Sequence, residues 1–276
     1  MRTSAIGLLA TGTLLVSTLI LTSCSGSGPQ EGSPAYYWDA AKETFAARDF
    51  GKTLQHLEKI TATDNEYTAR ARPWLLVMTS GMARGYIYLA DSFEAGARSN
   101  KTNPTDFRRR TNAYRGQANR LALEFVEVFD KFQKTKDDPV PLAMPFPTGS
   151  VGPVVQLTRA SAGMTLTQNE IDPAERSAVE RGVLLVACET AGSPEDPAKT
   201  QELLKSGTLQ IPRAQFVTAL AGTLYDVSSL YGPRGMDDPQ KAKILCNRAL
   251  DALKTVPETK RTKDLSAKIG KSLKKS

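Results

Sequence analysis

The residue with the clearest chemical role in the sequence is Cys24, which ends a hydrophobic N-terminal segment. Arg2 supplies a positive charge, and residues 5–21 form an apolar run that only Gly, Thr and Ser interrupt. The run is too short and too interrupted for a transmembrane helix, which needs about 20 apolar residues, and it is typical of a secretion signal. The thiol that follows has an appreciable thiolate fraction at neutral pH, which makes Cys24 a good nucleophile for accepting a lipid group.

The four residues at 21–24, LTSC, resemble the lipobox of bacterial lipoproteins. The resemblance implies that residues 1–23 are a signal peptide, that cleavage occurs before Cys24, and that this residue then carries a diacylglyceryl group and an acylated amine. Several chains hold a protein at a membrane, because each buried CH₂ contributes about 0.8 kcal/mol. Ser25 stands where Asp would retain an enterobacterial-type lipoprotein, so the resemblance favours the outer membrane and the periplasm. The alternative is an ordinary signal or anchor with a chance cysteine.

The rest of the sequence contains no recognisable catalytic or metal-binding pattern. A single histidine, His56, and the absence of CxxC leave too few ligands for a zinc site. The GKT and GKS triplets lack the glycine that a phosphate-binding loop carries five positions earlier. We therefore expect a protein that is not an enzyme, that binds no metal, and that has no cofactor apart from the covalent lipid on Cys24.

An arginine-rich stretch, FRRRTNAYRGQANR, is the clearest candidate for binding. The planar guanidinium group of arginine can form two parallel hydrogen bonds to a carboxylate or a phosphate, and a tyrosine within the stretch adds a stacking surface. The candidate binding residues are Arg108, Arg109, Arg110, Tyr114 and Arg115. The alternative is a solvated face of a helix.

Charge and cysteine content limit the partners. Of the 36 Lys and Arg residues only Arg2 precedes Cys24, so the chain from there on has 35 basic against 29 acidic residues, a net charge of +6. This balance suits anionic lipid headgroups, glycans or acidic proteins, and it equally fits a soluble lysine-rich surface. Nucleic acid is not an expected partner of an exported protein.

Cys188 and Cys246 lie in helical apolar patterns, where they either pair in an oxidising envelope or remain separate core residues.

Helices must position these residues, because nearly all of the sequence after Ser33 has a helical pattern. Residues 24–33 are Gly- and Ser-rich, which predicts a flexible tether. Ser33 and Pro34 are typical of a helix start. One helix follows them, residues 48–52 make a short break, and Leu54, Leu57 and Ile60 share one face of a second helix. The sequence therefore predicts an αα-hairpin here.

This hairpin resembles a tetratricopeptide repeat. Tyr37 precedes the small residues Ala40 and Ala41 at the family's spacing, and Asp49 and Phe50 fall on its turn. Near the C-terminus the same small-small-aromatic pattern occurs in AGTLY, followed by a helix with alanines seven residues apart. The resemblance implies an all-α fold, either a tetratricopeptide-like helical solenoid or an irregular helical bundle.

The middle of the chain has longer helical patterns. Residues 71–97 and 106–134 are each expected to form one helix, and Gly81 and Gly85 in the first predict that another segment packs closely there. A proline-rich connection at 136–153 divides a helical half at 34–135 from a second at 154–276, which ends in a basic tail. Residues 154–167 fit either a helix or a strand, and DPAE at 172–175 predicts a helix start. The tail either caps the fold or meets an anionic membrane.

These features favour a lipid-anchored scaffold that binds an envelope protein or peptide, as an accessory in envelope assembly, secretion or pilus formation. Helical repeats suit this role because they present extended concave surfaces. The alternative is a periplasmic solute-binding or transporter-accessory lipoprotein, in which Trp38, Trp74, Tyr86 and Tyr88 would line an apolar pocket. Core packing is the competing role for these four aromatic residues.

Overall fold

The computed structural model describes residues 28–147, 154–194 and 196–274, and this part of the chain is all-α apart from one small sheet. The predicted all-α class is confirmed. The predicted signal peptide at 1–23, Cys24 and the first residues of the predicted tether lie outside the described residues. The helices are α1 (Pro34–Ala46), α2 (Phe50–Thr61), α3 (Thr68–Ser99), α4 (Pro104–Gln133), α5 (Val155–Ser161), α6 (Gln168–Ala191), α7 (Pro197–Leu204), α8 (Arg213–Ser228), the short 3-10 helix η1 (Ser229–Tyr231), α9 (Pro239–Lys254) and α10 (Lys260–Leu273).

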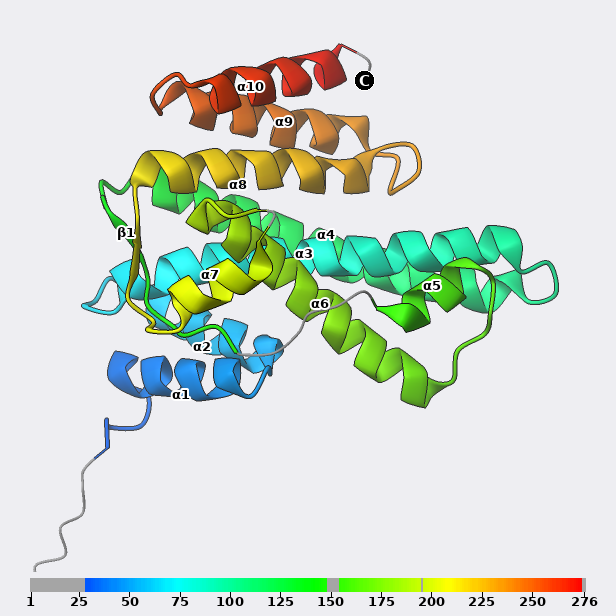
Figure 1. The fold of residues 1–276 in the computed structure, drawn as a ribbon, viewed down its shortest axis with the longest axis horizontal. Coiled ribbons are helices and arrows are strands. Elements are labelled where there is room, and N and C mark those ends of the chain that lie inside the picture. Colours follow the sequence, from blue (N-terminus) through cyan, green and yellow to red (C-terminus); the bar gives the residue numbers. More distant parts are fainter. Residues whose placement is uncertain (1–27, 148–153, 195, 275–276) are drawn as a thin grey trace, which may run out of the picture.

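The first two helices form the predicted αα-hairpin. The Ser33 side chain accepts a hydrogen bond from the backbone N–H of Tyr36 at the start of α1. Leu54, Leu57 and Ile60 are all buried on the inner face of α2. The hairpin packs on α3, which Figure 1 shows crossing the middle of the molecule beside α4.

The two longest helices, α3 and α4, have 32 and 30 residues and form an extensive contact with each other. Both are much longer than a helix of a repeat that fits two helices into about 34 residues. They make the central part of the fold an irregular bundle, to which the hairpin α1–α2 and the helices α8, α9 and α10 attach. Figure 1 shows these last three helices as successive layers at one end and α1 at the other.

Glycines bring α3 and α6 into backbone contact. A Cβ added at Gly81 would lie 2.5 Å from Val183 Cα, and one at Gly182 would lie 2.1 Å from the carbonyl oxygen of Gly81. A Cβ at Gly85 would lie 2.7 Å from the carbonyl oxygen of Ala178. The predicted close packing at Gly81 and Gly85 is confirmed, and the partner is α6.

The start of α6 differs from the prediction. The helix begins at Gln168, where the Thr167 side chain and the Glu170 carboxylate form a reciprocal capping box. Glu170 accepts from the Thr167 backbone N–H at 2.9 Å, and this contact holds its pKa at about 2. Pro173 therefore lies inside the helix. A proline near a helix start removes only one hydrogen bond from the first turns, so the earlier cap decides where the helix begins.

Two of the C-terminal helices begin at an aspartate that is followed by a proline. Asp196 and Asp238 each accept a hydrogen bond from the backbone N–H three residues on, at the starts of α7 and α9. The last helix, α10, packs on α9 and buries Ile269 completely. Cys188 and Cys246 are both buried with free thiols, and the Cys246 thiol donates to Ser228 Oγ at 3.4 Å.

The main core is continuous across the proline-rich connection. It includes Trp74 of α3, Phe132 of α4, and Phe216 of α8, so it joins residues from both sides of segment 136–153. That segment contributes strand β1 (Val140–Leu142), which pairs antiparallel with β2 (Leu209–Ile211). A second, smaller cluster surrounds the far end of α3, together with parts of α4, α5 and α6. Within the described residues, no helix combines the length and apolar character needed to cross a membrane.

Candidate functional site

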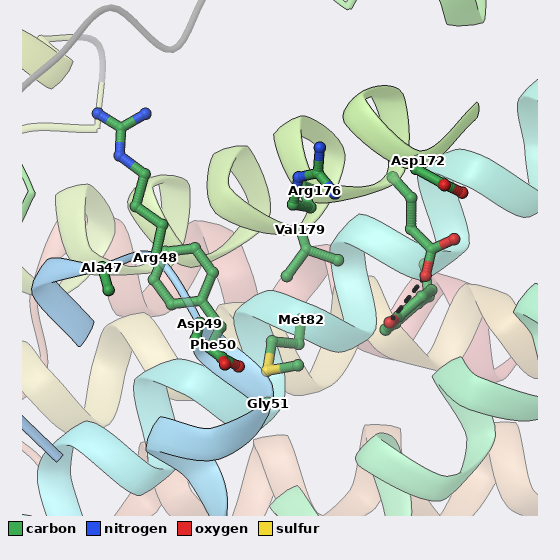
Figure 2. Close-up of a pocket in the computed structure, with 11 residues that line it drawn as sticks. Ala47, Arg48, Asp49, Phe50, Gly51, Met82, Asp172, Arg176 and Val179 are labelled. Atoms are coloured by element: carbon green, nitrogen blue, oxygen red, sulfur yellow. Dashed lines mark hydrogen bonds between the residues drawn. The ribbon is translucent and has the colours of Figure 1, made fainter. Parts of the chain in front are cut away.

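A cavity of about 520 Å³ lies where the turn between α1 and α2 meets α3 and α6 (Figure 2). We call it the turn pocket. Its walls come from the turn and the start of α2, from the middle of α3, and from the first half of α6. The lining residues are Ala47, Arg48, Asp49, Phe50, Gly51, Met82, Tyr86, Asp172, Glu175, Arg176 and Val179.

The floor of the turn pocket is apolar. Phe50, Met82 and Val179 line it and come from α2, α3 and α6 respectively. Each keeps only 5–6% of its surface accessible, so the three side chains are core residues with one edge in the cavity. Phe50 also packs edge-to-face on Phe45, with ring centroids 5.6 Å apart. The floor is therefore fixed by the core and does not depend on a bound ligand.

The turn itself places two charged residues at the rim. Arg48 has a φ of +61°, which turns the chain sharply after α1, and Asp49 then caps α2 through the backbone N–H of Lys52 at 3.1 Å. That hydrogen bond is the main cause of the lowered pKa of Asp49. Arg48 Nη1 lies 3.3 Å from Glu180 Oε2 on α6, which ties the turn to that helix.

Glu180 is the buried partner of this ion pair. Burial raises the pKa of its carboxyl group, while Arg48 acts in the opposite direction. Its second oxygen, Oε1, is buried without a hydrogen-bond partner. The charge of Arg48 is thus largely compensated by Glu180 behind the rim.

Two tyrosines hold the carboxylate of Glu175 in place. Tyr86 of α3 donates to Oε1 at 3.3 Å, which is the dashed line in Figure 2, and Tyr114 of α4 donates to Oε2 at 3.4 Å. The two rings stack with centroids 6.2 Å apart. Burial and the nearby Glu175 raise the pKa of both hydroxyls to about 12, so both remain protonated donors at neutral pH.

The other charged residues of the rim lie on α6. Asp172 and Arg176 are both exposed and lie four residues apart, one helical turn, with Glu175 between them. Figure 2 shows Arg48 and Asp172 at opposite sides of the pocket, with Met82 and Val179 between them. The turn pocket therefore combines a rigid apolar floor with one side that is rich in carboxylates and another that carries an arginine.

The predicted arginine-rich site has a different arrangement in the structure. Tyr114 is buried and faces α3 and α6. Arg109 and Arg110 both pair with Asp106 of the same helix, at 2.7 and 3.7 Å. Arg108 is exposed.

Arg115 is the most strongly engaged member of this group. It lies 3.6 Å from Glu94 of α3 and donates to the backbone carbonyl of Arg234. It also lines a second cavity of about 350 Å³. The five residues therefore do not converge on one surface, and a binding role for the exposed arginines stays a prediction.

The four aromatic residues considered for an apolar pocket lie in three different environments. Trp38 and Trp74 are buried in the main core. Tyr88 is exposed on α3, and Tyr86 lines the turn pocket. The remaining lining residues were not predicted, because the positive φ of Arg48 and the crossing of α3 with α6 have no local signature in the sequence.

In the part of the chain that the structure describes, no three His, Cys, Asp or Glu side chains are grouped to hold a metal ion. Comparison with protein-family models, with curated proteins and with solved structures found no match to this chain.

Proposed function

We propose that the protein is a lipid-anchored scaffold of the bacterial cell envelope that binds a segment of a partner protein in its turn pocket. The lipid on Cys24, in the lipobox-like sequence LTSC, would hold it at the outer membrane facing the periplasm. The role requires neither catalysis nor a metal, and no cofactor besides the lipid.

The observation that carries the proposal is the composition of the turn pocket. A fixed apolar floor supplies binding energy, since burying one large apolar side chain is worth about 1.5–3 kcal/mol. Charged groups at the rim select among partners more than they add affinity. Because the walls belong to three helices joined by a common core, the site is preformed and loses little entropy when a partner binds.

The second candidate is a solute-binding or transporter-accessory lipoprotein. The observation in its favour is the cavity volume of about 520 Å³, because small-molecule sites typically enclose about 300–1,000 Å³. Native mass spectrometry of the protein purified in mild detergent separates the two candidates. A recurrent bound small molecule would favour the solute role.

In-cell crosslinking followed by purification in mild detergent tests the scaffold role directly. The test compares the original protein with a variant in which a large side chain fills the turn pocket. Gly51 lines the pocket, and a Cβ there would meet only Asp49 Oδ1 at 3.8 Å, so Gly51→Trp should fill the pocket without disturbing the fold. Gly116 on α4 has no neighbouring atom within 4 Å of an added Cβ, so Gly116→Trp is the matched control. We expect a recurrent envelope protein to be lost with Gly51→Trp and kept with Gly116→Trp. Equal recovery with both variants would refute binding in this pocket.

A further inference from the structure

The turn pocket also indicates what kind of segment it binds, if the proposed function holds. We propose that it selects an extended peptide segment in which a positively charged group lies about two residues from a large apolar side chain. The positive group binds between Asp172 and Glu175, and the apolar side chain rests on the floor formed by Phe50, Met82 and Val179.

The charge at the α6 side of the pocket matches one positive group. Two carboxylates, Asp172 and Glu175, and one guanidinium, Arg176, line this side, so its formal charge is −1. On the opposite side Arg48 is paired with Glu180, and Asp49 is paired with Lys52 at 3.1 Å. Among the residues that line the rim, the net charge left by these pairs is therefore the negative one on α6.

Glu175 is prepared to accept a cationic donor. Each of its two oxygens accepts one tyrosine hydroxyl, and a carboxylate offers about four acceptor positions, so half of them remain for a ligand. The hydroxyls fix the orientation of the carboxylate before binding, which reduces the entropy that a ligand must overcome. The Tyr86 ring beside it adds a face on which an ammonium or guanidinium group is attracted.

The spacing between the carboxylates and the floor sets the spacing in the ligand. Val179 lies four residues after Glu175 on the same face of α6, an axial distance of about 6 Å at 1.5 Å per residue. In an extended peptide, residues i and i+2 point to the same side and lie about 7 Å apart. A positive side chain at i and an apolar one at i+2 therefore match the carboxylates and the floor.

Labelled peptides test this selectivity on the full chain purified in mild detergent, with fluorescence anisotropy as the measurement. The reference peptide is capped and contains Lys-Ser-Leu. We expect replacement of its lysine by glutamate, or of its leucine by serine, to weaken binding about tenfold in each case. A peptide with a free amino terminus in place of the lysine side chain should bind about as well as the reference if an amino terminus is the natural source of the charge.

A charge reversal on the protein identifies the contact. Asp172→Lys should reverse the preference, so that the Glu-Ser-Leu peptide binds more tightly than Lys-Ser-Leu. Asp264→Lys on α10 makes the same change in net charge at an exposed position outside the pocket and should leave the preference unchanged. An equal response to both variants, or equal binding of the three capped peptides, would overturn the inference.

The two proposals fail in different ways. If the peptides show no preference while Gly51→Trp still removes a partner in cells, the charge-selective contact is refuted and the scaffold role stands. If neither the peptides nor a cellular partner responds to any change in the turn pocket, both are refuted.

Discussion

Replacing Gly182 by alanine should destabilise the protein, although the same change in most helices stabilises it. Alanine is favoured over glycine inside a helix by about 1 kcal/mol. At this position the added Cβ would lie 2.1 Å from the carbonyl oxygen of Gly81 and 2.8 Å from the backbone nitrogen of Gly85. Both neighbours are backbone atoms, so no change of side-chain rotamer can relieve the overlap.

The size of the effect follows from these distances. An ordinary contact of a Cβ begins at 3.4 Å, so α3 and α6 must separate locally by about 1 Å. Overpacking of this kind typically costs about 1–3 kcal/mol and sometimes more. Because the overlapping atoms belong to the backbone, we take the upper end of this range, about 3 kcal/mol. The gain in helix propensity offsets about 1 kcal/mol of it, so we expect a net loss of about 2 kcal/mol in the free energy of unfolding. For a protein of this size the midpoint of thermal unfolding should fall by about 4–8 °C.

Thermal and urea unfolding followed by circular dichroism would measure this loss. The matched control is Gly116→Ala on α4, where an added Cβ has no neighbour within 4 Å, and which should raise stability by about 1 kcal/mol. Because α3 and α6 both line the turn pocket, Gly182→Ala should also weaken partner binding. If Gly182→Ala is as stable as the original protein or more so, the proposed backbone contact between α3 and α6 is refuted.

Three further predictions concern other parts of the molecule. Arg84 of α3 lies 2.7 Å from Glu189 of α6, and only 22% of the Arg84 side chain is exposed. Arg84→Ala should lower the free energy of unfolding in urea by about 3 kcal/mol, because it leaves the half-buried carboxylate of Glu189 unpaired. A loss below about 0.5 kcal/mol would contradict this prediction. Burial and the neighbouring Glu58 raise the pKa of Glu124 to about 8, so between about pH 5 and pH 9 the folded state holds a proton that the unfolded state has lost, and stability should fall as the pH rises through this range. Glu124→Gln should flatten this fall when unfolding is measured as a function of pH. An unchanged slope in the variant would count against the raised pKa. Cys24→Ser should abolish incorporation of a palmitate analogue and release the protein from the membrane fraction, and continued labelling would exclude this cysteine as the lipid site.

Local signals predicted much of the fold. Ser33 combines a side-chain acceptor with a following proline, and α1 begins there as predicted. Asp196 and Asp238 carry the same two signals at the starts of α7 and α9. Helix α6 begins earlier than Pro173 predicts, because Thr167 and Glu170 already satisfy the first backbone N–H groups upstream of the proline. Where two caps compete, proximity to a proline is the weaker signal.

Contacts between distant segments were not predictable in the same way. The pairing of Val140 with Ile211 joins two three-residue strands that are far apart in the sequence and carry no local pattern. Gly81 and Gly85 indicated a close contact on α3 but did not identify α6 as its partner. The turn pocket depends on that crossing and on the positive φ of Arg48, so its lining could be recognised only from the folded chain.

Site-specific photo-crosslinking in cells would test the central claim most directly. A photoreactive residue at position 51 lies at the turn pocket, and the same residue at position 116 lies on the exposed surface of α4. We expect position 51 to give one recurrent crosslink to an envelope protein, through a segment with a positive group near a large apolar side chain, and position 116 to give none. The same crosslinks from both positions, or none from position 51, would contradict a scaffold that binds its partner in the turn pocket.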